Sequence, residues 1–127
     1  MSKYWYEYVK ASYDLVIESE GQAEVFLEEE VEAYVVHLFA RNFTRTDIGI
    51  EPIALQILQT RDRERYQKIA DECLLINSFP LRRQRWPSDS YYSQLGTIAY
   101  GMASIDLMEK NFEPASRVLN TIFRKIG

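Results

Sequence analysis

Hydrophobic residues recur at intervals of three and four positions through most of the chain, which places them on one face of an α-helix. The clearest stripe runs from Leu27 to Phe39, and glutamates occupy the opposite side of the same segment. No segment combines strict alternation with the turn residues of a β-hairpin. The sequence therefore predicts an all-α fold, a compact helical bundle of about five to six helices.

The length of the chain limits how many hydrophobic cores it can build. With 127 residues, of which 46% are hydrophobic, it can bury one core but not two. We therefore predict a single helical domain that spans residues 1–127.

Glycine, proline and capping residues set the expected ends of the helices. Gly21 is expected to end the first helix, Thr60 to cap the fourth, and Pro80 to stop it. Asn111 is expected to break the chain before a last helix with Pro114 in its first turn. The expected helices cover about 3–20, 22–42, 52–58, 62–78, 88–110 and 114–126.

Small residues line two flanks of the expected helix over 88–110, and Gly96 and Gly101 are the smallest of them. A glycine inside a helix costs roughly 1 kcal/mol relative to alanine, so a compensating contact is expected. Close packing of neighbouring helices is the simpler reason, and it predicts that this helix is central and that Gly101→Leu destabilises the fold. The alternative is a small-molecule site against the bare backbone near both glycines.

Charge is unevenly distributed along the chain, whose formal net charge is −4. Residues 1–40 hold nine acidic and two basic side chains, whereas residues 41–86 hold nine basic and six acidic ones. Such asymmetry either steers a partner or is neutralised when the two parts pack together.

The segment "PLRRQRWPSDS", residues 80–90, concentrates basic and aromatic side chains between two prolines. Arg82, Arg83 and Arg85 have the guanidinium geometry that binds phosphate or carboxylate through paired hydrogen bonds. Trp86 could stack on a base or fill a partner's pocket. Three interpretations remain open: pairing with the protein's own acidic helix, an acidic protein partner, or nucleic acid or another polyanion, which the overall acidity disfavours.

Four aromatic residues lie within five positions at the N-terminus: Tyr4, Trp5, Tyr6 and Tyr8. Successive helical residues point about 100° apart, so these side chains cannot all face one core. Either another copy of the chain covers some of them, as in a homodimer, or the first helix is partly exposed to water.

The chain lacks the residues of most familiar catalytic and metal sites. One histidine, His37, and one cysteine, Cys73, cannot build a zinc finger or a di-iron site, and no glycine-rich phosphate loop occurs. A base–thiolate pair of these two residues is conceivable, as is a cation site at Glu24, Glu28 and Glu32, but a core cysteine and a solvated acidic face are favoured. We predict no catalytic residue, metal or cofactor.

A single cysteine suits a reducing compartment, and no apolar run is long enough for a signal peptide or a membrane span, so a cytoplasmic location is expected. We predict a non-enzymatic interaction, adaptor or regulatory module that self-associates. The alternatives are nucleic-acid or polyanion binding through residues 80–90, and small-molecule binding in the core of the bundle.

Overall fold

The computed structural model describes residues 3–42, 61–79 and 89–126, and these residues form six α-helices and no strand. The predicted all-α class is therefore confirmed. The expected helix over 52–58 lies outside the described residues. The helices are α1 (Lys3–Ala23), α2 (Glu29–Asn42), α4 (Arg63–Ser78), α5 (Asp89–Met102), α6 (Asp106–Lys110) and α7 (Phe112–Ile126).

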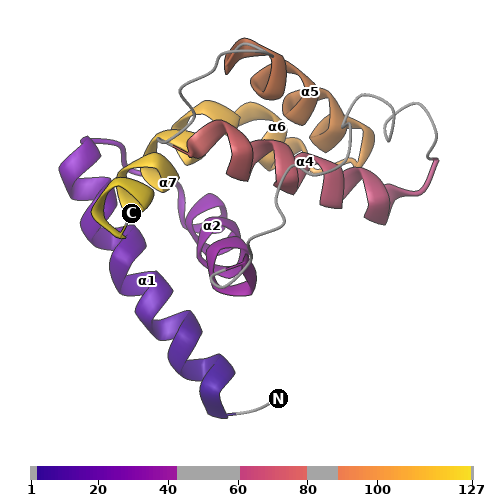
Figure 1. Cartoon of the computed structure of the whole chain (residues 1–127). Coiled ribbons are helices and arrows are strands. Elements are labelled where there is room, and N and C mark those ends of the chain that lie inside the picture. Colours follow the sequence, from indigo (N-terminus) through magenta and orange to yellow (C-terminus); the bar gives the residue numbers. More distant parts are fainter. Residues whose placement is uncertain (1–2, 43–60, 80–88, 127) are drawn as a thin grey trace.

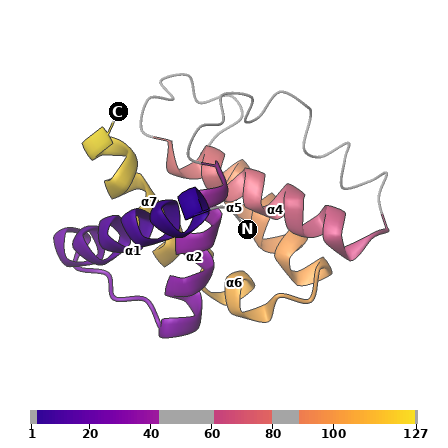
Figure 2. The ribbon, with the colours of Figure 1, turned by 90° about the horizontal axis from the view of Figure 1, so that it is seen from below.

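The helices pack around α7, which contacts α1, α2, α4 and α5 (Figure 1). α4 and α5 lie side by side. α1 crosses α2, and the N-terminal part of α1 points away from α4, α5, α6 and α7 (Figures 1 and 2). The prediction that the helix containing Gly96 is central was wrong. Ile98 and Met102 on the outer side of α5 are 51% and 45% exposed, because α4, α6 and α7 cover only its inner side.

The hydrophobic core draws side chains from every described helix. The stripe predicted in the second helix faces this core, with Val31, Val35 and Leu38 almost completely buried. No described helix has the length and apolarity required to cross a membrane. The largest fully buried side chains outside α2 are Tyr100, Leu74, Leu75, Met108, Leu119 and Ile122.

The end of α1 differs from the prediction. The helix continues through Gly21, and Glu24 takes a left-handed conformation with φ 57°. The Val25 N–H donates to the Glu20 carbonyl at 3.0 Å, and the Glu24 N–H donates to the Gly21 carbonyl at 3.4 Å. These two bonds form a Schellman motif, which ends the helix without glycine at the left-handed position. As a result, α2 begins later than predicted, at Glu29.

The same motif divides the single long helix that was predicted to reach Lys110. Ser104 has φ 60°, its N–H donates to the Gly101 carbonyl at 3.0 Å, and the Ile105 N–H donates to the Tyr100 carbonyl at 2.9 Å. These bonds close α5 before α6 begins. The prediction of an unbroken helix over 88–110 was therefore wrong.

The remaining predicted ends agree closely with the structure. α4 matches the expected span, although its N-cap is Asp62, which accepts a hydrogen bond from the Glu64 N–H at 3.1 Å, and not Thr60. Asn111 separates α6 from α7, and Pro114 lies in the first turn of α7 as predicted.

The two glycines of α5 have different surroundings. A Cβ placed on Gly96 would lie 2.8 Å from Cζ of Phe112 and 2.9 Å from Cβ of Cys73, so this glycine permits close helix packing. A Cβ on Gly101 would meet only the carboxylate end of Glu109, which is the far end of a flexible side chain. Side chains of the protein itself therefore occupy the space beside both glycines.

Candidate functional site

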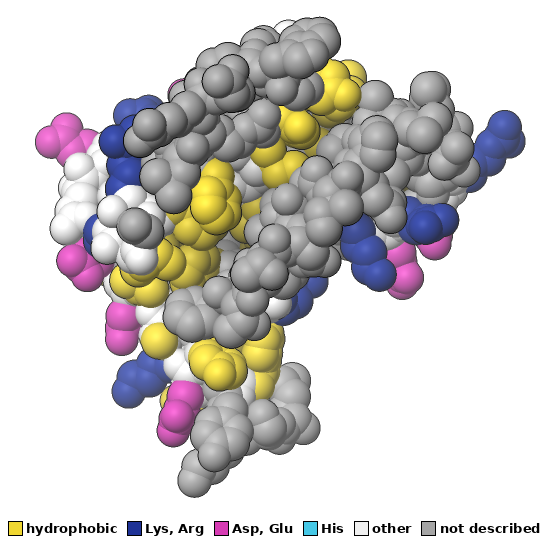
Figure 3. Space-filling view, in the orientation of Figure 1, with side chains coloured by type: hydrophobic (Ala, Val, Ile, Leu, Met, Phe, Trp, Pro, Cys, Tyr) yellow, Lys and Arg dark blue, Asp and Glu magenta, His cyan; other side chains and the backbone are white. Residues whose placement is uncertain are grey.

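α1 leaves several large side chains exposed along its length. Tyr6, Tyr13 and Ile17 are 72%, 48% and 42% exposed, and their spacing of seven and four residues places them on one stripe of the helix. Tyr8, on another side of the helix, is 46% exposed. Figure 3 shows hydrophobic side chains over α1, with charged side chains beside them. Such tyrosines are typical of contact surfaces, because their rings are apolar and their hydroxyl groups tolerate water.

Of the four N-terminal aromatic residues that were singled out from the sequence, the three whose side chains the structure describes differ in exposure. Trp5 is partly buried, whereas Tyr6 and Tyr8 are exposed. The side chain of Tyr4 lies outside the described residues. The aromatic surface of α1 extends further along the helix than predicted, because Tyr13 follows Tyr6 by two helical turns.

α1 and α2 frame a groove of about 500 Å³, referred to below as the α1–α2 groove. Each helix contributes residues at intervals of three and four positions, so one face of each forms a wall. The walls consist of Tyr6, Val9, Lys10, Tyr13, Glu29, Glu32, Ala33, Val36 and His37.

The two walls of the groove carry opposite charges. The wall from α1 contributes Lys10, and the wall from α2 contributes Glu29 and Glu32. His37 is exposed at the same wall, and its Nδ1 lies 2.9 Å from the Ala33 carbonyl oxygen. With tyrosine rings and valine side chains between these charges, the groove can accept an apolar side chain that is flanked by charged groups.

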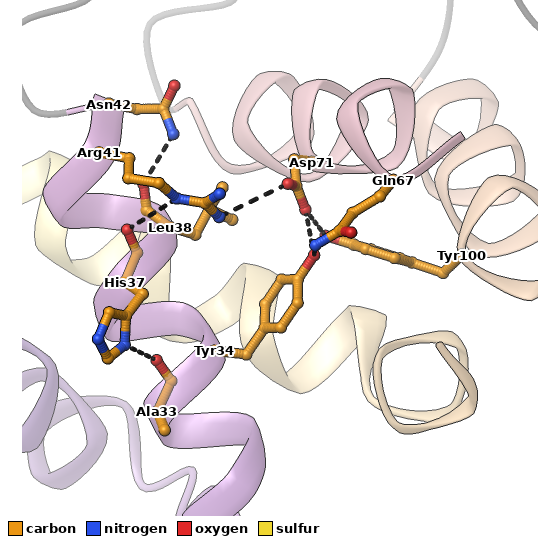
Figure 4. Close-up of polar contacts among 9 residues, drawn as sticks. All are labelled: Ala33, Tyr34, His37, Leu38, Arg41, Asn42, Gln67, Asp71 and Tyr100. Carbon is orange, nitrogen blue, oxygen red and sulfur yellow. Dashed lines mark hydrogen bonds and ion pairs between the residues drawn. The ribbon is translucent and has the colours of Figure 1, made fainter. Parts of the chain in front are cut away.

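A second polar feature lies inside the core, where three helices meet at Asp71 (Figure 4). Asp71 of α4 is only 8% exposed, and its Oδ1 accepts two hydrogen bonds of 2.6 Å. One comes from the hydroxyl of Tyr34 in α2 and the other from the hydroxyl of Tyr100 in α5. The rings of these tyrosines also pack edge to face, with centroids 5.9 Å apart.

Two further side chains connect this cluster to the surface. Arg41 Nη2 lies 3.8 Å from Asp71 Oδ2, and Gln67 Nε2 donates to the Tyr34 hydroxyl oxygen at 3.1 Å (Figure 4). The Arg41 Nε also donates to the His37 carbonyl at 3.3 Å, within α2. The cluster thus holds α2, and with it one wall of the groove, against α4 and α5.

Burial controls the protonation of this cluster. It raises the pKa of Asp71, while the hydroxyl groups of Tyr100 and Tyr34, followed by the charge of Arg41, act in the opposite direction. Burial and then the charge of Asp71 raise the pKa of both tyrosines, so both hydroxyl groups keep their protons and act as donors. Because hydroxyl groups from two other helices donate to one oxygen of Asp71, the cluster fixes the relative positions of the three helices.

Comparison with known proteins finds no matching family model, no similar curated protein and no matching solved structure. The function is therefore inferred from the residues of this chain.

The structure does not bring His37 and Cys73 together. Cys73 is fully buried in the core, where burial, and then the charge of Glu72, raise the pKa of its thiol to about 12. His37 lies exposed at the groove. A thiolate–imidazole pair between these residues is therefore not formed, and Cys73 is the core residue that was predicted.

The glutamates considered as a cation site lie on different segments of the chain. Glu24 follows α1, Glu28 precedes α2, and Glu32 lies within α2. Across residues 3–42, 61–79 and 89–126, no three histidine, cysteine or acidic side chains are grouped so as to hold a metal ion.

Residues 80–88, which contain the three arginines and Trp86, lie outside the described residues. Anion or partner binding by Arg82, Arg83, Arg85 and Trp86 therefore stays a prediction. Sequence reasoning missed the cluster around Asp71 and the groove. The only local signal for the cluster was an aspartate directly beside the apolar stripe of its helix.

Proposed function

We propose that this protein is a non-enzymatic interaction module that pairs with a second copy of itself through the α1–α2 groove. The observation that carries the proposal is the 72% exposure of Tyr6 at the edge of a groove that Val9 and Val36 also line. Covering Tyr6 and Tyr13, which are 72% and 48% exposed, removes apolar area from water, which favours association by roughly 25 cal/mol per Å² before the entropy cost of binding.

The distribution of charge supports a second copy as the partner. A two-fold symmetric interface uses the same patch on both chains, so the patch must be complementary to itself. The groove meets this requirement because Lys10 lies on one wall and Glu29 and Glu32 lie on the other. In an antiparallel pairing, Lys10 of each copy can face an acidic wall of the other copy.

Tyrosine is well suited to such a contact. Its ring provides a large apolar area with few rotatable bonds, so little side-chain entropy is lost when Tyr6 and Tyr13 are covered. The buried single cysteine, Cys73, fits a reducing compartment, and we propose the cytoplasm as the location of the module.

Charge reversal tests the proposal. We expect Lys10→Glu and Glu29→Lys each to lower the fraction of dimer measured by sedimentation equilibrium, because each places like charges across the interface. The double variant Lys10→Glu/Glu29→Lys restores opposite charges, and its dimer fraction should return towards that of the unmodified protein.

Lys68→Glu provides the matched control, since Lys68 is exposed on α4 and the substitution makes the same change in net charge. Its dimer fraction should equal that of the unmodified protein. A protein that stays monomeric at every concentration contradicts the proposal, and so does a Lys68→Glu variant that dissociates as strongly as Lys10→Glu.

A further inference from the structure

Glu20 is a buried carboxyl group near the end of α1 with only half of its hydrogen-bonding capacity used. The residue is 4% exposed, and its Oε2 accepts a hydrogen bond of 3.0 Å from the Leu27 N–H. Its Oε1 is buried and accepts no hydrogen bond. A buried ionised carboxylate with an unsatisfied oxygen is costly, so burial favours the neutral, protonated form of Glu20.

A second carboxyl group, that of Glu32 in α2, acts on Glu20 both as a hydrogen-bonding neighbour and as a like charge. Two ionised carboxylates repel each other and cannot form a hydrogen bond. When one of them is protonated, its O–H can donate to the other, and the repulsion between the two groups is removed.

The three cations of α7, the other helix packed against α1, are paired with other side chains or exposed. Lys125 Nζ pairs with Glu18 Oε1 at 3.5 Å, Arg124 Nε donates to Asn120 Oδ1 at 2.8 Å, and Arg117 is exposed. The charged side chain that acts on Glu20 is therefore Glu32.

Glu32 in turn lines the α1–α2 groove, together with Lys10, Glu29 and His37. Its carboxyl group connects the buried end of α1 with the groove wall. Within the part of the chain that the structure describes, the two glutamates belong to no group of three metal-binding side chains.

We propose that Glu20 and Glu32 share one proton, and that loss of this proton weakens the packing of α1 against α2. The pair acts as a pH-sensitive joint between these helices. The joint follows from the contacts around Glu20 and does not depend on self-association.

The electrostatics around Glu20 place the loss of the shared proton in the neutral pH range. Burial, followed by the contact with Glu32, raises the pKa of Glu20 from its ordinary value of 4.5 to about 7, although the Leu27 N–H acts in the opposite direction. Between these two values the unfolded chain has released a proton that the folded chain retains. Folding is therefore favoured at acidic pH, and this contribution is lost as the pH rises through 4.5 to about 7.

The test compares Glu20→Gln with the unmodified protein in urea unfolding at pH 5 and pH 8, at one protein concentration. The glutamine amide can donate permanently to Glu32, which imitates the protonated acid. We expect the folding equilibrium constant of Glu20→Gln relative to that of the unmodified protein to increase roughly tenfold to a hundredfold from pH 5 to pH 8.

Glu18→Gln is the matched control, because Glu18 lies two residues away on α1 and its side chain is 60% exposed. This variant should keep the pH dependence of the unmodified protein. Asp71 also titrates from a buried position, and its contribution is the same in all three proteins. Equal pH profiles for Glu20→Gln and the unmodified protein would overturn the proposal.

A second measurement covers the case in which Glu20→Gln fails to fold. The side-chain carboxyl carbon of Glu20 can be followed by NMR in the unmodified protein as the pH is changed. A midpoint near 7 is expected, and a midpoint near 4.5 would overturn the proposal. Neither measurement depends on solution mass, so failure of the shared proton is distinguishable from failure of self-association.

Discussion

The hydroxyl group of Tyr100 donates a hydrogen bond of 2.6 Å to Oδ1 of Asp71 and so joins α5 to α4 inside the core. The hydroxyl of Tyr34 donates to the same oxygen from α2. One buried carboxylate thereby fixes the relative positions of three helices. Because the acceptor is buried, water cannot replace a donor that is removed.

Tyr100→Phe should destabilise the protein by about 1.5–3 kcal/mol, the usual range for a hydrogen bond to a charged group. The substitution keeps the ring in place and removes only the hydroxyl. Urea unfolding at pH 7 measures the change. Tyr6→Phe removes the same group from an exposed position and should change the free energy of unfolding by less than about 0.5 kcal/mol. Equal losses in the two variants would contradict the role of the cluster.

Gly96→Ala should destabilise the fold by about 1–3 kcal/mol, because the added methyl group would overlap the ring of Phe112 and approach Cβ of Cys73. Gly101→Ala is the control, since its methyl group would meet only the movable carboxylate of Glu109. Thermal unfolding of both variants measures the difference. If Gly101→Ala proves the more damaging, the close approach of helices occurs on the other flank of α5.

The end of α1 predicts two stabilising substitutions. Gly21 lies within the helix with open space around it, so Gly21→Ala should stabilise the protein by about 0.5–1 kcal/mol. Glu24 has φ 57°, so Glu24→Gly should stabilise by a similar amount, about 0.5–1 kcal/mol. Glu24→Ala retains the strain and should have little effect on the urea midpoint. If Glu24→Ala stabilised the protein as much as Glu24→Gly, the stabilisation would come from removal of the glutamate side chain and not from relief of backbone strain.

The helix ends that the sequence failed to predict share a physical cause. Glycine is the residue that most often takes the left-handed position at a helix end, and Gly21 lies near the end of α1. The left-handed position nevertheless falls on Glu24 after α1 and on Ser104 after α5. In both places two backbone hydrogen bonds and the packing of the following helix outweigh the local preference for glycine. The helical periodicity of the hydrophobic residues was sufficient to predict the all-α class, the buried face of α2 and the span of α4.

The polar features were harder to predict, because they depend on which helices meet. Asp71 is one acidic residue beside an apolar stripe. The sequence pattern around it is the same whether its side chain faces water or two tyrosines. Glu20 likewise resembles any other glutamate near the end of a helix until Glu32 is brought beside it. The exposure of some N-terminal aromatic side chains was predictable, because successive side chains of a helix point in different directions. That Tyr13 shares a surface with Tyr6 was not predicted, because both line a groove that forms only where α1 packs against α2.

The thiol of Cys73 should report on the integrity of the core. It is fully buried, and its pKa of about 12 leaves almost no thiolate at pH 8. A thiol reagent should therefore label the native protein only through transient opening, at a rate far below that in urea. Gly96→Ala, which crowds Cys73, should increase the rate of labelling, and Gly101→Ala should not. Rapid labelling of the unmodified native protein would place Cys73 at an accessible surface and contradict the packing of α5 against α4.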